Sequence, residues 1–279
     1  SDLRIESVFE VTSGMADGDV KNVDAKEETP SVEFKNVSLT YSGSGAPSVE
    51  GINFKAMKGQ TIGVIGGTGS GKSSLVNLIP RLYDATQGEV LVDGVNVKEY
   101  DIETLRNKVG IVMQKAVLFK GTIRENMWMG KKGATDEQID EALEISQSKE
   151  FVDSKEGRLD YPIEQGGKNL SGGQRQRLTI ARAIVRKPDV LILDDSASAL
   201  DFATDAALRK AIRGMNNSPT VFIVSQRAAS LMYADLIIVL DDGQVAGMGT
   251  HDELLANCEV YKEIYESQFK KADSEGGVA

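Results

Sequence analysis

The arrangement of apolar and polar positions along this chain predicts an α/β fold. Almost wholly apolar runs occur at residues 61–65, 109–113, 190–193 and 220–224, and such runs are typical of strands buried on both faces of a sheet. Between them, apolar residues recur at the three- and four-residue spacing of amphipathic helices. Strands that alternate with helices favour a mostly parallel sheet. The predicted helices span residues 73–79, 122–129, 136–145, 149–152, 172–185, 203–212, 251–256 and 259–270.

Two parts of the pattern differ from this alternation. Residues 32–41 alternate between apolar and polar side chains, and residues 52–57 and 89–92 add two short strands. Together they predict a small antiparallel β subdomain beside the main sheet. The region 115–170 lacks a strong strand pattern up to Leu159, so we expect an α-helical subdomain there.

Both ends of the chain carry weaker patterns. Residues 1–11 are weakly amphipathic, and residues 17–30 are polar and acidic with almost no large apolar side chain, which is typical of a linker. Because the chain begins at Ser1 rather than at a methionine, we expect it to be a piece of a longer protein. Residues 272–279 are predicted to be a disordered tail.

The composition narrows the class of partner. The chain has 279 residues, of which 41% are hydrophobic and 27% charged, as in ordinary globular proteins. Its formal net charge of −10 argues against nucleic acid as a partner, because phosphate backbones are bound mainly by Lys and Arg. The single cysteine, Cys258, excludes an internal disulfide and fits a reducing compartment. No apolar run reaches the ~18 residues that a membrane helix needs.

The clearest chemical signal is the stretch GGTGSGKSS at residues 66–74, between a predicted strand and a predicted helix. It fits the phosphate-binding pattern G-x-x-x-x-G-K-[ST], in which glycines let successive N–H groups converge on phosphate oxygens. Lys72 can reach the outer phosphates, and the Ser73 hydroxyl can bind Mg²⁺. A glycine-rich turn that matches by chance is disfavoured because both flanks fit. The candidate nucleotide contacts are Gly67, Thr68, Gly69, Ser70, Gly71, Lys72, Ser73 and Ser74.

A phosphate loop needs an acidic partner for Mg²⁺, and Asp194 is the candidate. It ends the apolar run 190–193, so its carboxylate is expected at the carboxyl end of a buried strand, where ligands bind in such sheets. Acidic residues at strand ends are common, and the pairing with the loop is what favours the metal role.

The most specific pattern is LSGGQ at residues 170–174. Ser171 is predicted to cap the following helix, and Gly172 and Gly173 leave N–H groups bare for phosphate. With the phosphate loop and the acidic strand end, this pentapeptide makes residues 32–270 resemble the ATP-binding cassette of ABC transporters. The candidate contacts here are Ser171, Gly172, Gly173 and Gln174.

The resemblance implies a P-loop NTPase (RecA-like) core that binds ATP and Mg²⁺. It places Tyr41 on the adenine ring with Val49 beside it, and a stacked base contributes ~1–3 kcal/mol. It implies that Gln114 contacts Mg²⁺ and the attacking water and links to a membrane domain. Residues 198–201, which end at Asp201, resemble a segment that contacts the other cassette of a dimer, and Asp201 is counted among the candidate nucleotide contacts. Residues 164–167 and 249–255 match exporter-type cassettes.

In this family, two cassettes enclose two ATP molecules head to tail. The resemblance therefore implies that residues 171–174 serve a partner's nucleotide. It also implies that residues 1–30 are a linker remnant after a missing transmembrane domain of the same parent chain, and that residues 31–271 form the ATP-binding domain. Such a domain is expected at the cytoplasmic face of the cell membrane.

Two positions depart from the family pattern. Asp195 stands where the family has a glutamate as general base, and Gln226 stands where it has a histidine. A general base must lie within about 2.6–3.2 Å of its proton, and aspartate is one methylene shorter than glutamate. Glutamine can donate a hydrogen bond to a phosphate but cannot carry a proton, and His251 belongs to a different motif. We therefore expect a site that binds ATP but hydrolyses it weakly.

This pattern resembles the degenerate-site subunit of a heterodimeric bacterial multidrug exporter, whose LSGGQ completes the partner's competent site. Two other interpretations stay open. One is a fully active homodimeric ATPase in which Asp195 suffices as the base. The other is a soluble ABC ATPase not linked to transport. Its DNA-maintenance type needs a long coiled coil between the phosphate loop and LSGGQ, and only about a hundred residues, 74–170, intervene here. The translation type usually has two cassettes in one chain, and the acidic charge opposes both types.

Overall fold

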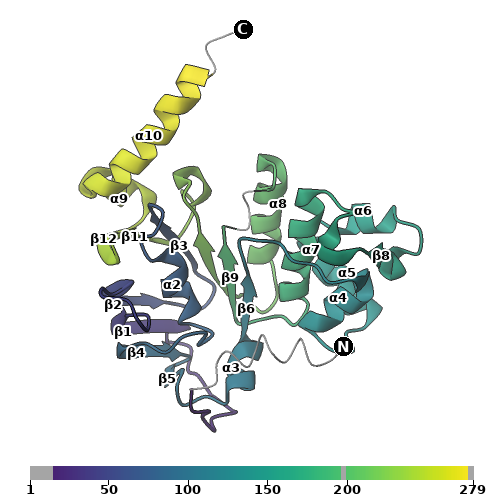
Figure 1. Ribbon diagram of the computed structural model, residues 1–279, viewed down its shortest axis with the longest axis horizontal. Helices are drawn as coiled ribbons and strands as arrows, with labels where there is room; N and C mark the ends of the chain where they lie inside the picture. The colour runs from purple at the N-terminus through teal and green to yellow at the C-terminus, as the bar shows by residue number, and fades with distance from the viewer. Residues whose placement is uncertain (1–14, 196–198, 276–279) are drawn as a thin grey trace.

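A six-stranded sheet forms the centre of the structure (Figure 1). The computed structural model describes residues 15–195 and 199–275, with side chains up to residue 268. The strand order is β12-β11-β3-β10-β9-β6, with β12 antiparallel at one edge and the other strands parallel. Among the described residues, no helix is both long and apolar enough to cross a membrane. The bounds are β3 Thr61–Gly66, β6 Val109–Val112, β9 Val190–Asp194, β10 Thr220–Val224, β11 Leu236–Asp241 and β12 Gln244–Gly249.

The register of the three middle strands explains where the site lies. Val224 of β10 pairs with Val64 of β3 on one side and with Asp194 of β9 on the other. Every residue of these three strands is buried, as their apolar runs predicted. Because their carboxyl ends are level, the phosphate loop after β3, Asp195 after β9 and Gln226 after β10 follow neighbouring strand ends at one edge of the sheet.

A second sheet of four antiparallel strands, β2-β1-β4-β5, lies beside the first (Figure 1). Phe34 and Phe54 stack with their ring centroids 4.6 Å apart, and Phe54 meets Phe222 of β10 edge-on at 6.1 Å. Helix α2 buries Leu75 and Val76 in the same core cluster. The phosphate loop is thus held between two sheets. The bounds are β1 Val32–Leu39, β2 Val49–Ala56, β4 Gln87–Val92, β5 Val95–Asn96 and α2 Lys72–Asn77.

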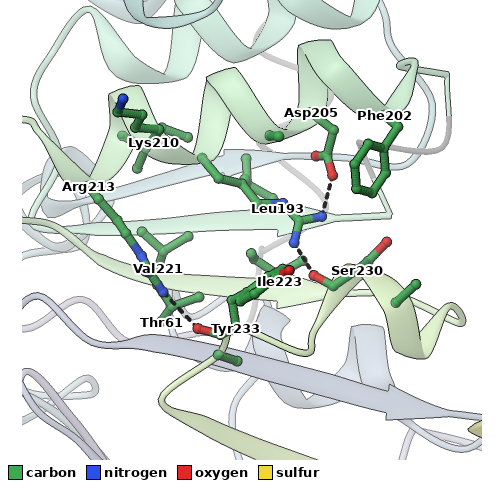
Figure 2. Close-up of a pocket in the computed structure, with 15 residues that line it drawn as sticks. Thr61, Leu193, Phe202, Asp205, Lys210, Arg213, Val221, Ile223, Ser230 and Tyr233 are labelled. Carbon is green, nitrogen blue, oxygen red and sulfur yellow. Dashed lines mark hydrogen bonds and ion pairs between the residues drawn. The ribbon is translucent and has the colours of Figure 1, made fainter. Parts of the chain in front are cut away.

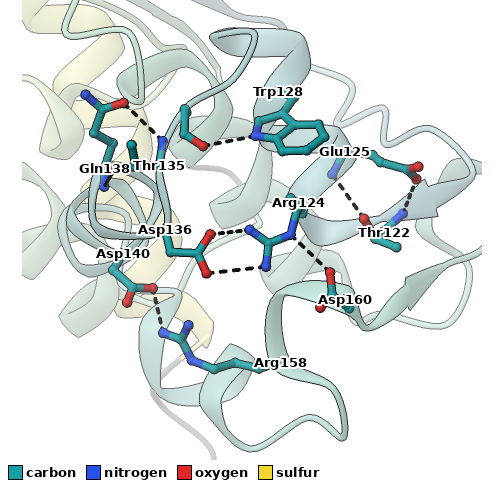
Figure 3. A network of polar contacts seen from close by, with 11 residues as sticks. Thr122, Arg124, Glu125, Trp128, Thr135, Asp136, Gln138, Asp140, Arg158 and Asp160 are labelled. Carbon is teal, nitrogen blue, oxygen red and sulfur yellow. Dashed lines mark hydrogen bonds and ion pairs between the residues drawn. The ribbon is translucent and has the colours of Figure 1, made fainter.

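The helical subdomain lies on the far side of the central sheet from the small sheet (Figure 1). Arg124 joins its parts through ion pairs to Asp136 and to Asp160, the latter 3.0 Å away (Figure 3). The capping boxes of Thr122 and Thr135 start its first two helices. The bounds are α4 Ile123–Gly130, α5 Asp136–Ile145, α6 Lys149–Asp153, α7 Gly172–Ile184, and the 3₁₀ turns η2 Arg158–Asp160 and η3 Gln165–Gly167.

The predicted α/β class, with a mostly parallel sheet, an antiparallel β subdomain and an α-helical subdomain, is confirmed. The helical region also contains a short strand pair that the pattern did not predict, in which β7, Gly121–Thr122, pairs with β8, Pro162–Ile163. Strands of two residues are too short to show a periodic pattern. Helix α3, Ile102–Lys108, was also missed, although Asp101 accepts a hydrogen bond from the backbone N–H of Thr104 as a helix cap does.

The C-terminal part ends in α10, which extends away from the body of the protein (Figure 1). The prediction ended this helix at Lys270 and began a disordered tail at residue 272, but α10 continues to Glu275. No glycine or proline interrupts it before Gly276. The bounds are α8 Phe202–Arg213, η4 Ala228–Ser230, α9 His251–Asn257 and α10 Glu259–Glu275.

Part of the predicted linker is held against the cassette. Gly18 and Val20 donate backbone hydrogen bonds to Tyr100 and Glu99, and Arg81 donates to the carbonyl of Ala16 at 2.9 Å. A Cβ on Gly18 would lie 2.2 Å from the Glu99 carbonyl oxygen, so only glycine allows this approach. The weak helix predicted over residues 1–11 lies outside the described residues.

Candidate functional site

The phosphate loop holds its lysine in place through its own backbone. Lys72 is buried, and its Nζ donates to the carbonyl oxygens of Gly66 at 2.9 Å and Gly67 at 2.7 Å. Burial lowers the pKa of Lys72, and the charges of Asp194 and Asp195 oppose that shift. The ammonium group therefore lies within the loop, where it can move onto a phosphate oxygen over a short path.

The turn of the loop depends on Gly71. Its φ of +97° belongs to the left-handed region, and a Cβ there would lie 2.4 Å from the Ser48 carbonyl oxygen and 2.7 Å from Val49 Cγ1. Val49 is fully buried beneath the loop and supports this turn, so its predicted contact with a base stays a prediction. Gly71 also starts α2 without any side-chain cap, which leaves the first N–H groups of the helix for a ligand.

Tyr41 lies next to the start of α2. Its hydroxyl is 2.8 Å from Ser74 Oγ, and its ring meets Tyr83 edge-on with a centroid distance of 5.0 Å. Ser48 Oγ lies 2.7 Å from the same Ser74 hydroxyl. Tyr41 is half-buried and Tyr83 is 44% exposed, so both rings can offer surface to an adenine. Ser48 and Tyr83 belong to no motif, so the sequence did not predict them as neighbours of Tyr41 and Ser74.

Ser73 and Asp194, the two predicted Mg²⁺ ligands, meet at the end of β9. Ser73 Oγ donates to Asp194 Oδ2 at 2.9 Å. Burial raises the pKa of Asp194, the hydrogen bond from Ser73 and the charge of Lys72 lower it, and the charge of Asp195 raises it. A buried carboxylate of this kind would be stabilised by a cation.

The donor set also suits Mg²⁺. Mg²⁺ is typically held by one or two carboxylates together with substrate phosphates and water rather than by a full protein cage. In the described part of the chain, no group of three or more His, Cys, Asp or Glu side chains could hold a metal ion. One carboxylate and one hydroxyl beside a phosphate loop are therefore the residues expected for a nucleotide-bound Mg²⁺.

Asp195 lies close to Gln114 rather than free. Gln114 Nε2 donates to Asp195 Oδ2 at 3.3 Å, and both side chains reach the same end of the central sheet. Asp195 has φ +46°, and its N–H donates to the Val224 carbonyl at 2.8 Å. A non-glycine residue in the left-handed region is strained by about 1–2 kcal/mol. The hydrogen bond to Val224 holds the backbone of Asp195 in this conformation, and the backbone in turn sets the direction of the short side chain.

Gln226 is exposed just beyond β10. Its backbone carbonyl accepts a hydrogen bond from Gln268 Nε2 at 2.7 Å, which belongs to α10. The adjacent Ser225 is buried, and its N–H donates to the Val64 carbonyl of β3 at 3.1 Å. The glutamine thus follows directly on a strand that is fixed to β3.

The LSGGQ segment lies at the protein surface. Ser171 Oγ accepts from the Gln174 N–H at 3.2 Å, and Gln174 Oε1 accepts from the Ser171 N–H at 3.1 Å, which confirms the predicted cap and completes a capping box. Ser171 and Gly172 are exposed. The N–H groups of Gly172 and Gly173 come first in the helix and have no partner within it, so this helix start can bind an anion brought by another molecule.

Asp201 caps α8. Its carboxylate accepts from the Thr204 N–H at 2.9 Å and from the Thr204 hydroxyl at 2.7 Å. These hydrogen bonds lower the pKa of Asp201, the one from the hydroxyl most. The side chain is therefore committed to its own helix, and its predicted contact with nucleotide stays a prediction. Ser198, the first residue of the same predicted segment, lies outside the described residues.

Comparisons with known proteins agree with this geometry. A family model described as ABC transporter matches residues 49–198. An uncharacterised ABC transporter ATP-binding protein of Mycobacterium bovis is 40% identical over 278 residues, which are 99% of this chain and 47% of that protein. A Bacillus subtilis protein of the same description is 43% identical over 244 residues, covering 88% of this chain and 42% of its own. A Staphylococcus aureus protein, provisionally named a multidrug export ATP-binding/permease protein, is 38% identical over 237 residues, covering 85% and 41%.

Among solved structures, a bacterial Atm1-family ABC exporter with ATP bound is similar with a TM-score of 0.83 and 31% identity, covering 95% of this chain and 47% of the other. The chain spans less than half the length of each of these relatives. Because the family model matches more than half of the chain and the likeness extends over nearly all of it, the chain belongs to the ABC transporter family, as a nucleotide-binding domain of the exporter type.

Proposed function

We propose that this domain powers export across a membrane by ATP-driven pairing with a second, different cassette, while its own site holds ATP and hydrolyses it slowly. The observation that carries this proposal is a contrast within one site. The residues expected to bind ATP are all of the usual types, whereas Asp195 and Gln226 replace the residues expected to cleave it.

Binding at this site would use groups that are already close together. Lys72 leaves the carbonyls of Gly66 and Gly67 for the outer phosphates, and the uncapped start of α2 receives the phosphate charge. Ser73 and Asp194 hold Mg²⁺, which when bound neutralises charge on the phosphates. Tyr41 stacks on the adenine ring.

Slow hydrolysis follows from the reach and chemistry of two side chains. Asp195 is one methylene shorter than a glutamate, its φ is fixed at +46°, and its Oδ2 accepts from Gln114. A water that needs a base within about 2.6–3.2 Å is then beyond good reach of this carboxylate. Gln226 donates a hydrogen bond to the terminal phosphate but takes up no proton. Loss of a well-placed base lowers the rate by roughly 10²–10⁴.

The partner cassette supplies the other half of the cycle. Ser171 and Gly172 are exposed at the start of α7 and Gly173 follows them in its first turn, so this segment is open to a second molecule. We assign them to the partner's ATP, where a complete catalytic pair would cut it. The two cassettes would then pair when ATP binds and separate after its hydrolysis.

A membrane domain of the same parent chain would dock beside Gln114. Exposed apolar side chains gather in the segment that follows β6 and in α4, and Arg182 joins two of them by donating to the Val117 carbonyl at 2.9 Å and by lying 5.7 Å from the Phe119 ring centroid. Such a patch favours a protein contact. The domain would then work at the cytoplasmic face of the cell membrane. The exposed residues are Met113, Val117, Phe119, Trp128 and Met129.

The test restores the two altered residues in the full-length protein, purified with its partner subunit after the partner's own site has been inactivated. Asp195→Glu together with Gln226→His should raise single-turnover ATP hydrolysis at this chain's site by at least about tenfold. The matched control is Asp242→Glu, the same change at an exposed aspartate with φ +45° in the β11–β12 turn, which should leave the rate unchanged.

Two results would contradict the proposal. One is no gain in the restored variant. The other is rapid hydrolysis by the wild-type chain without a second type of subunit, near the ~10 s⁻¹ of a typical enzyme, which would favour a fully active homodimer.

A further inference from the structure

The C-terminal helix α10 contacts the segment that carries Gln226 through one side chain. Gln268 Nε2 donates to the backbone carbonyl of Gln226 at 2.7 Å, and Gln268 Oε1 accepts from the N–H of Ala228 at 2.9 Å. The single amide group therefore brackets Arg227 from both sides, although Gln268 lies 40 residues further along the chain than Ala228. Because the NH₂ group donates one hydrogen bond and the oxygen accepts the other, only one orientation of the amide fits both partners.

The base of α10 is anchored firmly enough to transmit this contact. Tyr261 is fully buried, and its hydroxyl lies 2.7 Å from His251 Nδ1 of α9. The ring of His251 also lies 5.2 Å from that of Tyr265, centroid to centroid. Two turns of helix separate Tyr261 from Gln268, and a helix of this length is stiff. The position of Gln268 is thus determined by the packing of α10 against α9.

Just beyond the segment that carries Gln226, a cavity is bordered by Ala229, Ser230, Tyr233 and Ala234. This cavity of about 420 Å³ separates α8 from η4 and the following residues, with Leu193 and Ile223 on its floor and Tyr233 at its rim (Figure 2). Contacts across the gap are polar: Arg209 donates to the Ser230 carbonyl, and Arg213 donates to the Tyr233 carbonyl at 2.7 Å. Ala228 is fully buried, so its N–H needs the partner that Gln268 provides.

We propose that Gln268 is a positioning residue for Gln226, so that α10 sets how well this cassette distinguishes ATP from ADP. The inference rests on the proposed function in one respect, the contact between Gln226 and the terminal phosphate. The two hydrogen bonds from Gln268 hold the backbone after β10 in one conformation. The exposed side chain of Gln226 therefore starts from a fixed backbone position. Without the bracket, the segment can relax toward the cavity and the phosphate contact weakens.

The test measures equilibrium affinity for fluorescent analogues of ATP and of ADP in the full-length protein with its partner subunit. Gln268→Ala should weaken ATP binding at this chain's site by roughly five- to tenfold, a partial loss of one hydrogen bond to the charged phosphate, and leave ADP binding within about twofold. Ser267→Ala, one residue earlier on the same helix, removes only a hydroxyl that bonds to the Ile264 carbonyl and should change neither affinity. In a Gln226→Ala background, Gln268→Ala should cause no further loss.

The outcomes separate this inference from the proposed function. If Gln226→Ala leaves the preference for ATP over ADP unchanged, the phosphate contact itself is wrong. If Gln226→Ala lowers that preference and Gln268→Ala does not, or if Gln268→Ala weakens both nucleotides equally, the positioning role is wrong. Should Gln268→Ala unfold, Gln268→Glu retains an acceptor for the Ala228 N–H, loses the donor to Gln226 and sets a carboxylate oxygen against the Gln226 carbonyl. Gln268→Glu should also lower the preference for ATP, and an unchanged preference would overturn the inference.

Discussion

The starts of helices α2 and α7 differ in how their unpaired backbone N–H groups are treated. Helix α2 begins at Gly71, in the left-handed region, with no side-chain cap and no acidic residue in its first turn. Helix α7 begins at Ser171 with a complete capping box closed by Gln174. Every helix start has N–H groups without partners inside the helix. In α2 they are left open at a buried loop, and in α7 the capping box satisfies two N–H groups, those of Ser171 and Gln174, at the surface.

The difference shows how each start meets a phosphate. The α2 start gathers several polar groups, because Lys72, Ser73 and Asp194 converge on it and Ser70 Oγ is buried there without a hydrogen-bond partner among the described residues. At the α7 start, the charged neighbours are Arg175 and Arg177, which donate to the backbone carbonyls of Leu170 and Gly173 rather than gathering with a hydroxyl and a carboxylate. The α7 start is a stable, self-capped surface feature that needs another molecule to supply the phosphate, and this is why we assign it to a partner's nucleotide.

Substitution of Gly71 should break the α2 start with the largest effect. In Gly71→Ala, the new Cβ would lie 2.4 Å from the Ser48 carbonyl oxygen, and the backbone would also be strained at φ +97°. We expect a loss of about 3 kcal/mol or more in the free energy of unfolding, together with loss of ATP binding. Urea unfolding of the 279-residue chain and nucleotide titration measure the two effects.

Gly69→Ala is the matched control for this prediction. Gly69 has φ +78° in the same loop, but nothing lies within 4 Å of the Cβ that it would gain. Only the strain of a left-handed alanine applies there, about 1–2 kcal/mol. Equal losses in the two variants would mean that the contact between Gly71 and residues 48–49 does not support the loop.

Substitution of Ser171 should separate the two helix starts functionally. Ser171→Ala removes the cap of α7, which should lower the free energy of unfolding by about 1 kcal/mol. Because the change leaves α2 untouched, ATP binding at this chain's own site should be unaffected, while hydrolysis by the partner in the full-length complex should fall. Stability, binding and hydrolysis are measured on the same preparation.

The capping box at Thr135 provides the control. Thr135→Ala removes the same kind of cap from α5, so it should cost similar stability without lowering hydrolysis. A fall in hydrolysis that is equal in the two variants would show that loss of helix stability, rather than loss of a contact with nucleotide, explains the Ser171 result.

The sequence predicted those parts of the site that depend on local patterns. The cap at Ser171 and the meeting of Ser73 with Asp194 follow from short motifs placed at the ends of apolar runs, and strand order then brings the ends together. Hydrogen bonds between distant segments leave no such pattern. The link from Ser48 to Ser74 and the bracket made by Gln268 depend on tertiary packing and could only be found in the structure.

The smallest expected effect concerns the charge of Asp194. Burial raises the pKa of this carboxyl, so the folded state disfavours its ionised form, and above the raised pKa this charge destabilises the protein without nucleotide. Asp194→Asn should therefore raise the free energy of unfolding of the nucleotide-free chain at neutral pH, by about 1 kcal/mol or less. The gain should shrink as the pH falls through the raised pKa, because the wild-type carboxyl then becomes neutral as well. With Mg²⁺ and ATP present the order of stability should reverse, since asparagine cannot balance the charge of the cation.

Thermal unfolding across a pH series measures this difference in stability, and Asp241→Asn, at an exposed aspartate, is the control that should change stability little. A variant less stable than the wild type without nucleotide would mean that the carboxylate is needed to hold the α2 start together, and not only to bind what it receives.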